Sequence, residues 1–129
     1  SLTLKYMSTV NMMMEYLQKE GFVPTRESFG IAFRYQMKNY LFLDNDDDPS
    51  FFQLVMPGIC DVNDDNRARI HLAMDAMNSS VKVAKASIFN DEVWLYAELL
   101  IDSTPQLGDI VPRALGILQH AYKVFAEKY

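Results

Sequence analysis

The fold is decided by residues 61–101, which read DVNDDNRARIHLAMDAMNSSVKVAKASIFNDEVWLYAELLI. In its first part, apolar residues recur at the spacing of one helical face, which predicts a helix that ends near residues 78–80. These residues are Ile70, Ala73, Met74 and Met77. The part after the helix predicts a β-hairpin. We therefore expect the helix to divide a single sheet into two blocks of strands.

The two strands of the hairpin are predicted on either side of Asn90 and Asp91, residues that tolerate the positive φ of a two-residue turn. The second strand alternates strongly, with Trp94 and Tyr96 on one face and aliphatic residues on the other. The first, over residues 82–89, alternates weakly and contains two lysines, which is typical of an edge strand.

The chain before this stretch predicts a helix over residues 3–20, with Ser1 or Thr3 as its cap and Gly21 as its end. Three consecutive methionines, residues 12–14, cannot all face one core. Because methionine adapts to varied partners, we expect some of them at a helix edge or a contact surface.

Three strands are predicted next, over residues 27–36, 40–43 and 51–60. The first of them alternates, and its apolar face is expected to consist of Phe29, Ile31, Phe33 and Tyr35. The third is apolar on both faces, as in a strand that is covered on both sides. Pro57 and Gly58 predict a bulge or bend near its end, because proline cannot donate to a central ladder.

The chain closes with an apolar stripe that predicts a final helix, with Thr104 as N-cap and Pro105 at the first helical position. Pro112 lies inside this stripe, where it removes a backbone bond and clashes with the preceding turn. We therefore expect a short helical turn, followed by a kink or a restart with Asp109 as cap.

The predicted order of elements is α-β-β-β-α-β-β-α. The links between neighbouring strands are too short for parallel crossovers, which need a dozen or more residues. The sequence therefore predicts an α+β fold: one mainly antiparallel, five-stranded sheet with three helices, in a single domain over residues 1–129.

Composition restricts the partners. The formal net charge of −5 disfavours binding to nucleic acid and to anionic lipid, which both need clustered lysine and arginine. The single cysteine cannot form an intramolecular disulfide, and no apolar run reaches the ~20 residues of a membrane span. We expect a cytoplasmic protein without nucleic-acid or membrane partners.

No motif in the sequence supports catalysis, a metal or a cofactor. The acidic runs at residues 44–48 and 61–66 lack the glycine and glutamate of a calcium-binding loop, and they are interpreted as a turn and a helix cap. Cys60, His71 and His120 have no glycine-rich elbow or oxyanion motif near them. We therefore expect no enzymatic activity and no cofactor.

An alternative stays open, in which the chain is a small-molecule-binding or enzymatic domain. Its pocket would lie between sheet and helices, with Arg34, Glu98 and His71 as the polar groups.

The pattern of this chain resembles the bacterial YbjN family, small proteins described as sensory-transduction regulators with a type III secretion chaperone-like fold. The resemblance covers residues 16–125 and rests on hydrophobicity and element order. Pro112 and the methionine-rich first helix do not match it. The positions that carry it are Asn66, Asn78, Lys85, Asn90, Asp91 and Val93.

The resemblance implies a non-catalytic, protein-binding or regulatory module that acts as a homodimer and has a protein client as a further partner. It implies dimerisation through the middle helix and the strand that starts at Val81, while the aromatic strand adds an apolar surface. The candidate partner or dimer surface consists of Ile70, Met74, Met77, Val81, Val83, Lys85, Trp94 and Tyr96.

Overall fold

The computed structural model describes residues 8–45 and 47–129. In these residues it has three helices and one six-stranded sheet, whose strands lie in the order β1-β2-β3-β4-β6-β5 and pair antiparallel throughout. This confirms the α+β class. The elements are α1 (Thr9–Lys19), β1 (Thr25–Glu27), β2 (Gly30–Tyr35), β3 (Lys38–Leu43), β4 (Phe51–Asp61), α2 (Arg67–Ser80), β5 (Ala84–Phe89), β6 (Glu92–Leu100) and α3 (Leu107–Lys128).

The prediction of five strands was wrong by one, because β1 was not recognised. Residues 27–36 do not form one strand: a two-residue turn at Ser28 and Phe29 joins β1 to β2, with Glu27 paired to Gly30. Phe29 therefore lies in the turn with 42% of its surface exposed, instead of on the apolar face of the strand.

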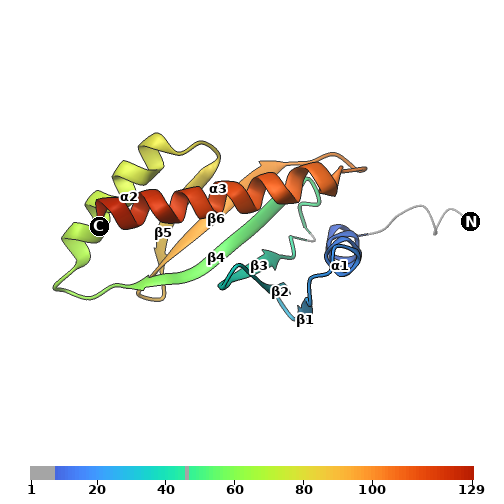
Figure 1. Ribbon diagram of the computed structural model, residues 1–129, viewed down its shortest axis with the longest axis horizontal. Coiled ribbons are helices and arrows are strands. Elements are labelled where there is room, and N and C mark those ends of the chain that lie inside the picture. The colour runs from blue at the N-terminus through green and yellow to red at the C-terminus, as the bar shows by residue number, and fades with distance from the viewer. Residues whose placement is uncertain (1–7, 46) are drawn as a thin grey trace, which may run out of the picture.

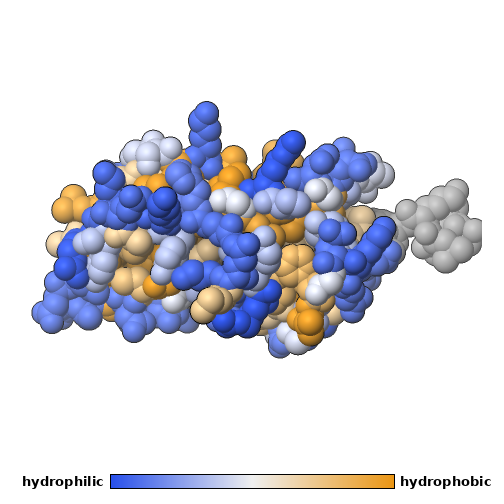
Figure 2. Space-filling view, in the orientation of Figure 1, coloured by the Kyte–Doolittle hydropathy of each residue, from blue (hydrophilic) through white to orange (hydrophobic). Residues whose placement is uncertain are grey.

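The three helices lie on one face of the sheet. Figure 1 shows α3 lying across β4 and β6, with α2 at the end formed by β5 and α1 at the end formed by β1, β2 and β3. In the same orientation, hydrophilic side chains dominate the surface, and hydrophobic ones show in smaller areas between them (Figure 2). The strands contribute to the core between the layers through Ile31, Phe33, Tyr40, Phe42, Phe52, Leu54, Met56, Val93, Leu95 and Ala97. In the described part of the chain, no helix is long and apolar enough to cross a membrane.

The first helix begins at Thr9, later than expected, because the side chain of Ser8 accepts a hydrogen bond from the backbone N–H of Asn11 (3.2 Å) and caps it. The expected caps, Ser1 and Thr3, lie outside the described residues. Met13 is fully buried, whereas its two methionine neighbours are half-buried at the edges of the buried face.

The last helix runs without a restart through Pro112, so the expected restart at Asp109 was wrong. Thr104 is not its cap either, since the helix begins at Leu107. Pro112 is the sixth residue of the helix, and its missing N–H removes the backbone bond to the Gly108 carbonyl near the start of the helix. The helix therefore loses one backbone bond and continues.

The turn predicted from Asn90 and Asp91 and the bulge predicted from Pro57 were both confirmed. Asn90 and Asp91 have φ values of 51° and 56° and join β5 to β6 as a two-residue turn. The pairing of β4 with β6 shifts between Met56 and Cys60, which is the bulge predicted from Pro57.

Among the described residues, no helix lies on the other face of the sheet, which we call the open face (Figure 1). One residue of each strand contributes to a row of directly paired residues that crosses the open face from edge to edge: Thr25, Ala32, Leu41, Val55, Tyr96 and Lys85. Val55 has no exposed surface although it is absent from the core under the helices. The open face therefore has an apolar centre of its own.

The edge strand β5 is closed by a side chain of α2. Asn78 Oδ1 accepts from the backbone N–H of Ala86 (2.7 Å), and Asn78 Nδ2 donates to the Ala86 carbonyl oxygen (3.2 Å). The amide of Asn78 thus replaces the peptide group of a neighbouring strand. Since an unpaired edge invites pairing with another chain, Asn78 protects β5 at its middle.

Tyr40 carries a buried hydroxyl without a proper partner. Its side chain is fully buried, and the hydroxyl makes no hydrogen bond of good geometry with the described residues. Gln119 lies close, but its Nε2 donates to Gln36 Oε1 (2.7 Å). Burial raises the pKa of Tyr40 from 10.0 to about 12, because the charged form is poorly solvated; Gln119 opposes this effect and Tyr35 adds to it.

We expect Asn78→Ala to lower the free energy of unfolding by about 1–3 kcal/mol, because it leaves two half-buried backbone groups of Ala86 without partners. Urea denaturation measures this loss. Ser79→Ala is the matched control, since the Ser79 hydroxyl bonds to Asp75 O within the same helix. Equal stability of the two variants would contradict the edge-closing role, because alanine favours the helix at both positions.

We expect Tyr40→Phe to raise the free energy of unfolding at neutral pH by about 1 kcal/mol, because it removes an unsatisfied buried hydroxyl. The raised pKa stabilises the fold below pH 10.0, and this contribution is lost as the pH rises toward about 12. Denaturation at stepwise pH should show the wild type losing roughly 2–3 kcal/mol more than the variant over this range. Tyr96→Phe is the control, since Tyr96 is not among the groups that act on the Tyr40 hydroxyl, and a wild-type slope in Tyr40→Phe would refute the assignment.

Candidate functional site

The eight residues of the candidate surface do not form one surface. Ile70 and Met77 are fully buried and Val81 is 8% exposed, because the stripe of α2 that contains them packs on the core. These three residues are therefore not available to a partner. Of the other five, Met74 is half-buried on α2, whereas Val83, Lys85, Trp94 and Tyr96 lie at or near the open face of β5 and β6.

The exposed apolar residue of α2 is one that sequence reasoning missed. Leu72 has 73% of its surface exposed and lies outside the buried stripe of the helix. The sequence did contain a signal for this exposure, because a leucine that lies off the periodic apolar stripe of an amphipathic helix points away from the core. We call the side of α2 that faces solvent the outer face; it consists of Ala68, Leu72, Asp75, Ala76 and Ser79.

The link from α2 to β5 is strained at Val83. Its φ is 72°, and Ala84 N donates to Lys82 O at 2.8 Å, which closes a γ-turn around it. A β-branched residue at positive φ costs about 1–3 kcal/mol and persists only when the surrounding structure imposes it. The turn leaves 52% of the Val83 surface exposed beside the start of β5.

The polar residues of the open face at β5 and β6 bind one another. Lys85 Nζ lies 2.7 Å from Glu98 Oε1, and Glu98 Oε2 accepts from Gln53 Nε2 at 2.7 Å. Lys85 Nζ also lies 5.5 Å from the centre of the Tyr96 ring, which in turn stacks on Trp94. Lys85 and Glu98 are thus engaged with their own chain.

The alternative pocket of Arg34, Glu98 and His71 is not assembled. Arg34 is on β2, and two strands separate it from Glu98 on β6. His71 is exposed on α2. These three residues share no cavity, so the small-molecule site that was based on them has no geometric support.

Arg34 instead lies in an open groove of about 800 Å³ beside β2. The register places Ala32, Arg34, Asn39 and Leu41 on the open face, where they form its floor. The connection from α1 to β1 lines one side and Pro57 of β4 the other. The groove is lined by residues 20–23, 25, 32–35, 39–41 and 57. Glu20 and Arg34 are the charged side chains among them.

Arg34 has no acidic partner among the described residues. Its Nη1 donates to Asn39 Oδ1 at 2.8 Å, and the ion pairs of the described chain are made by Arg67 and Lys85. Both Arg34 and Asn39 are exposed. The guanidinium therefore keeps free donors that face solvent in the groove.

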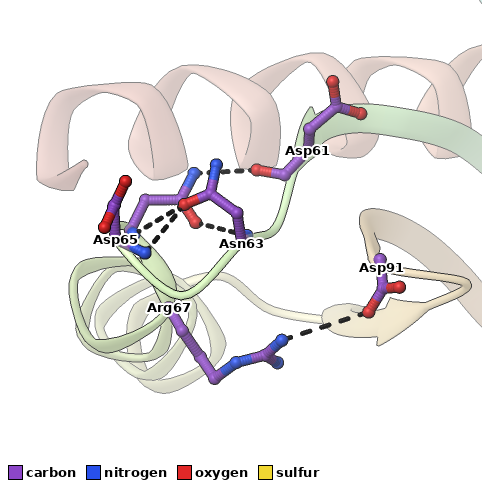
Figure 3. A network of polar contacts seen from close by, with 6 residues as sticks. Asp61, Asn63, Asp65, Arg67 and Asp91 are labelled. Carbon is purple, nitrogen blue, oxygen red and sulfur yellow. Dashed lines mark hydrogen bonds and ion pairs between the residues drawn. The ribbon is translucent and has the colours of Figure 1, made fainter.

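The acidic residues before α2 form a structural loop and not a metal site (Figure 3). Asn63 Oδ1 accepts from the backbone N–H of Asp65 (2.9 Å) and of Asn66 (3.1 Å). Asn66 Nδ2 donates to Asp61 O (2.8 Å) and, at the far end of the chain, to Tyr129 Oη (3.1 Å). Asn66 precedes the first helical residue, and no cluster in the described residues could hold a metal.

The residues weighed for nucleophilic chemistry lie apart. Cys60 is half-buried in β4, with its Sγ 3.6 Å from Asp61 O. His71 and His120 are exposed on α2 and α3. Nothing in the described residues places a base beside the thiol.

Comparison with known proteins shows the fold. No protein-family model and no curated protein sequence matches the chain. Among solved structures, it is similar to one described as "YbjN, a putative transcription regulator from E. coli", with a TM-score of 0.66, 11% sequence identity, and coverage of 92% of this chain and 89% of that one. The chain has a YbjN-like fold, as the resemblance in its sequence implied.

Proposed function

We propose that this chain is a cytoplasmic, non-catalytic, single-domain module that binds protein or regulates, and that it acts as a homodimer. Its YbjN-like fold supports a regulatory module, because the similar structure is described as a regulator. Fold does not fix function, so the proposal also needs support from the surface of this chain.

The observation that carries the proposal is the outer face of α2. It presents Leu72, with 73% of its surface exposed, between Ala68 and Ala76, one turn away on either side. Small residues around one large apolar residue let two helices approach closely, so that each leucine packs over the alanines of the other. A two-fold axis across α2 would bury the same patch on both copies.

Two further features support this surface. Val83 is exposed next to the C-terminal end of α2. Its backbone is strained, and strained residues of this kind cluster at binding sites. The amides of Asn66 and Asn78 are engaged in loop and edge contacts, which hold the two ends of α2 in place.

We expect light scattering at micromolar concentration to give the mass of a dimer for the wild type and of a monomer for Leu72→Glu, because a buried charge without a partner is strongly unfavourable. Leu100→Glu is the matched control, since Leu100 is 77% exposed at the end of β6 and lies away from α2. A monomeric wild type, or a dimer that both variants leave intact, would count against this surface.

A further inference from the structure

The two edges of the sheet differ in whether another strand can pair with them. At the β5 edge, Asn78 occupies the backbone groups of Ala86. At the opposite edge, β1 covers only part of β2: its three residues pair with residues 30–32 and leave residues 33–35 without a neighbour on that side. A strand could therefore add to β2 without displacing a helix.

The register defines which backbone groups are free there. Tyr35 and Lys38 close the two-residue turn between β2 and β3, so odd-numbered residues of β2 bond to β3 and even-numbered ones face β1. Ala32 uses this side for Thr25. The N–H and carbonyl of Arg34 also point this way, but no backbone hydrogen bond joins Arg34 to residues 8–24, the described part of the chain before β1.

The chain itself leaves this place open. Val23 would be the partner of Arg34 if β1 continued backwards, yet residues 22–24 are not in a strand. The side chain of Val23 is 86% exposed. The groove described above begins where the chain diverges from β2, so its floor includes an unused donor and acceptor.

The charge at this place selects the partner. The guanidinium of Arg34 has no acidic partner in the described chain, although the whole chain has a net charge of −5. Glu20, the other charged residue of the groove, lies at the C-terminal end of α1 and repels an acid at that end. Ala32, Leu41 and Pro57 add apolar lining to the groove.

We propose that this groove binds an extended peptide segment of a partner protein, which pairs with β2 at Arg34 and carries an acidic side chain that binds the Arg34 guanidinium. Main-chain pairing supplies affinity and the charge supplies specificity, as in other cases of strand addition. This inference rests on the proposed protein-binding function and identifies the chemistry of the bound segment. The shallow, open groove suits an extended chain better than a small molecule, which a pocket usually encloses.

The test uses a fluorescein-labelled hexapeptide of alternating valine and threonine with one central glutamate, blocked at both ends. We expect a dissociation constant on the order of 100 μM at low salt, because the contact is small and exposed. Replacing the glutamate with lysine should weaken binding about fivefold, and Arg34→Gln should remove this difference between the peptides. Arg113→Gln, on the exposed side of α3, is the matched control and should leave both affinities unchanged.

A second measurement reports the backbone contact. Amide chemical shifts on titration with the peptide should change at residues 22–25 and 33–35, and methylation of the central peptide nitrogens should abolish binding, because it removes the donors that pair with β2. No binding at millimolar peptide, equal affinity of the two charge forms, or shifts confined to β5 would overturn the inference. The dimer expected in light scattering would be unaffected by such a result. Failure of the peptide proposal is therefore distinguishable from failure of the proposed function.

Discussion

The pairing of β4 with β6 is the contact on which the rest of the structure depends. The strands β1 to β4 form one meander and β5 with β6 form one hairpin, and the register from Phe51–Leu100 to Asp61–Glu92 joins the two blocks into a single sheet. Helix α3 lies across this seam and closes the core over it (Figure 1). Because β6 and not β5 joins β4, the chain must carry α2 past the hairpin, which places α2 against β5 at the edge.

Local residue chemistry made part of this fold predictable from sequence. Asn90 and Asp91 have the positive φ that their side chains tolerate, and Pro57 marks the bulge of β4. β1 was missed because three exposed residues carry no apolar pattern, and the turn after it has no glycine or asparagine in its two central positions. Pro112 was misjudged because it lies near the start of α3, where one lost backbone bond does not end the helix, and periodicity does not show where the helix begins.

The candidate surface was harder to predict than the fold, and the reason is physical. A periodic apolar stripe identifies the side of a helix that packs inward, so Ile70 and Met77 were bound to be core once α2 lay on the sheet. The positions that carried the family resemblance have structural roles: Asn66 holds the loop before α2, Asn78 closes the edge, and Lys85 pairs across strands with Glu98. The chain has its YbjN-like fold at only 11% sequence identity to the similar structure.

Helix α2 connects the surfaces of the molecule with one another. Its inner stripe fills the core, Asn78 completes the β5 edge, and Leu72 is exposed on its outer face. A contact on the outer face that held α2 in place would also hold the amide of Asn78 against Ala86 and keep this edge closed. At the other end of the sheet α1 packs near β2, but no described residue pairs with the backbone of Arg34 on the side that faces β1. The two ends of the sheet therefore have opposite properties. At the β5 end, α2 presents an apolar face and blocks the addition of a strand. At the β1 end, the short β1 leaves backbone groups of β2 free beside Arg34, which has no acidic partner among the described residues.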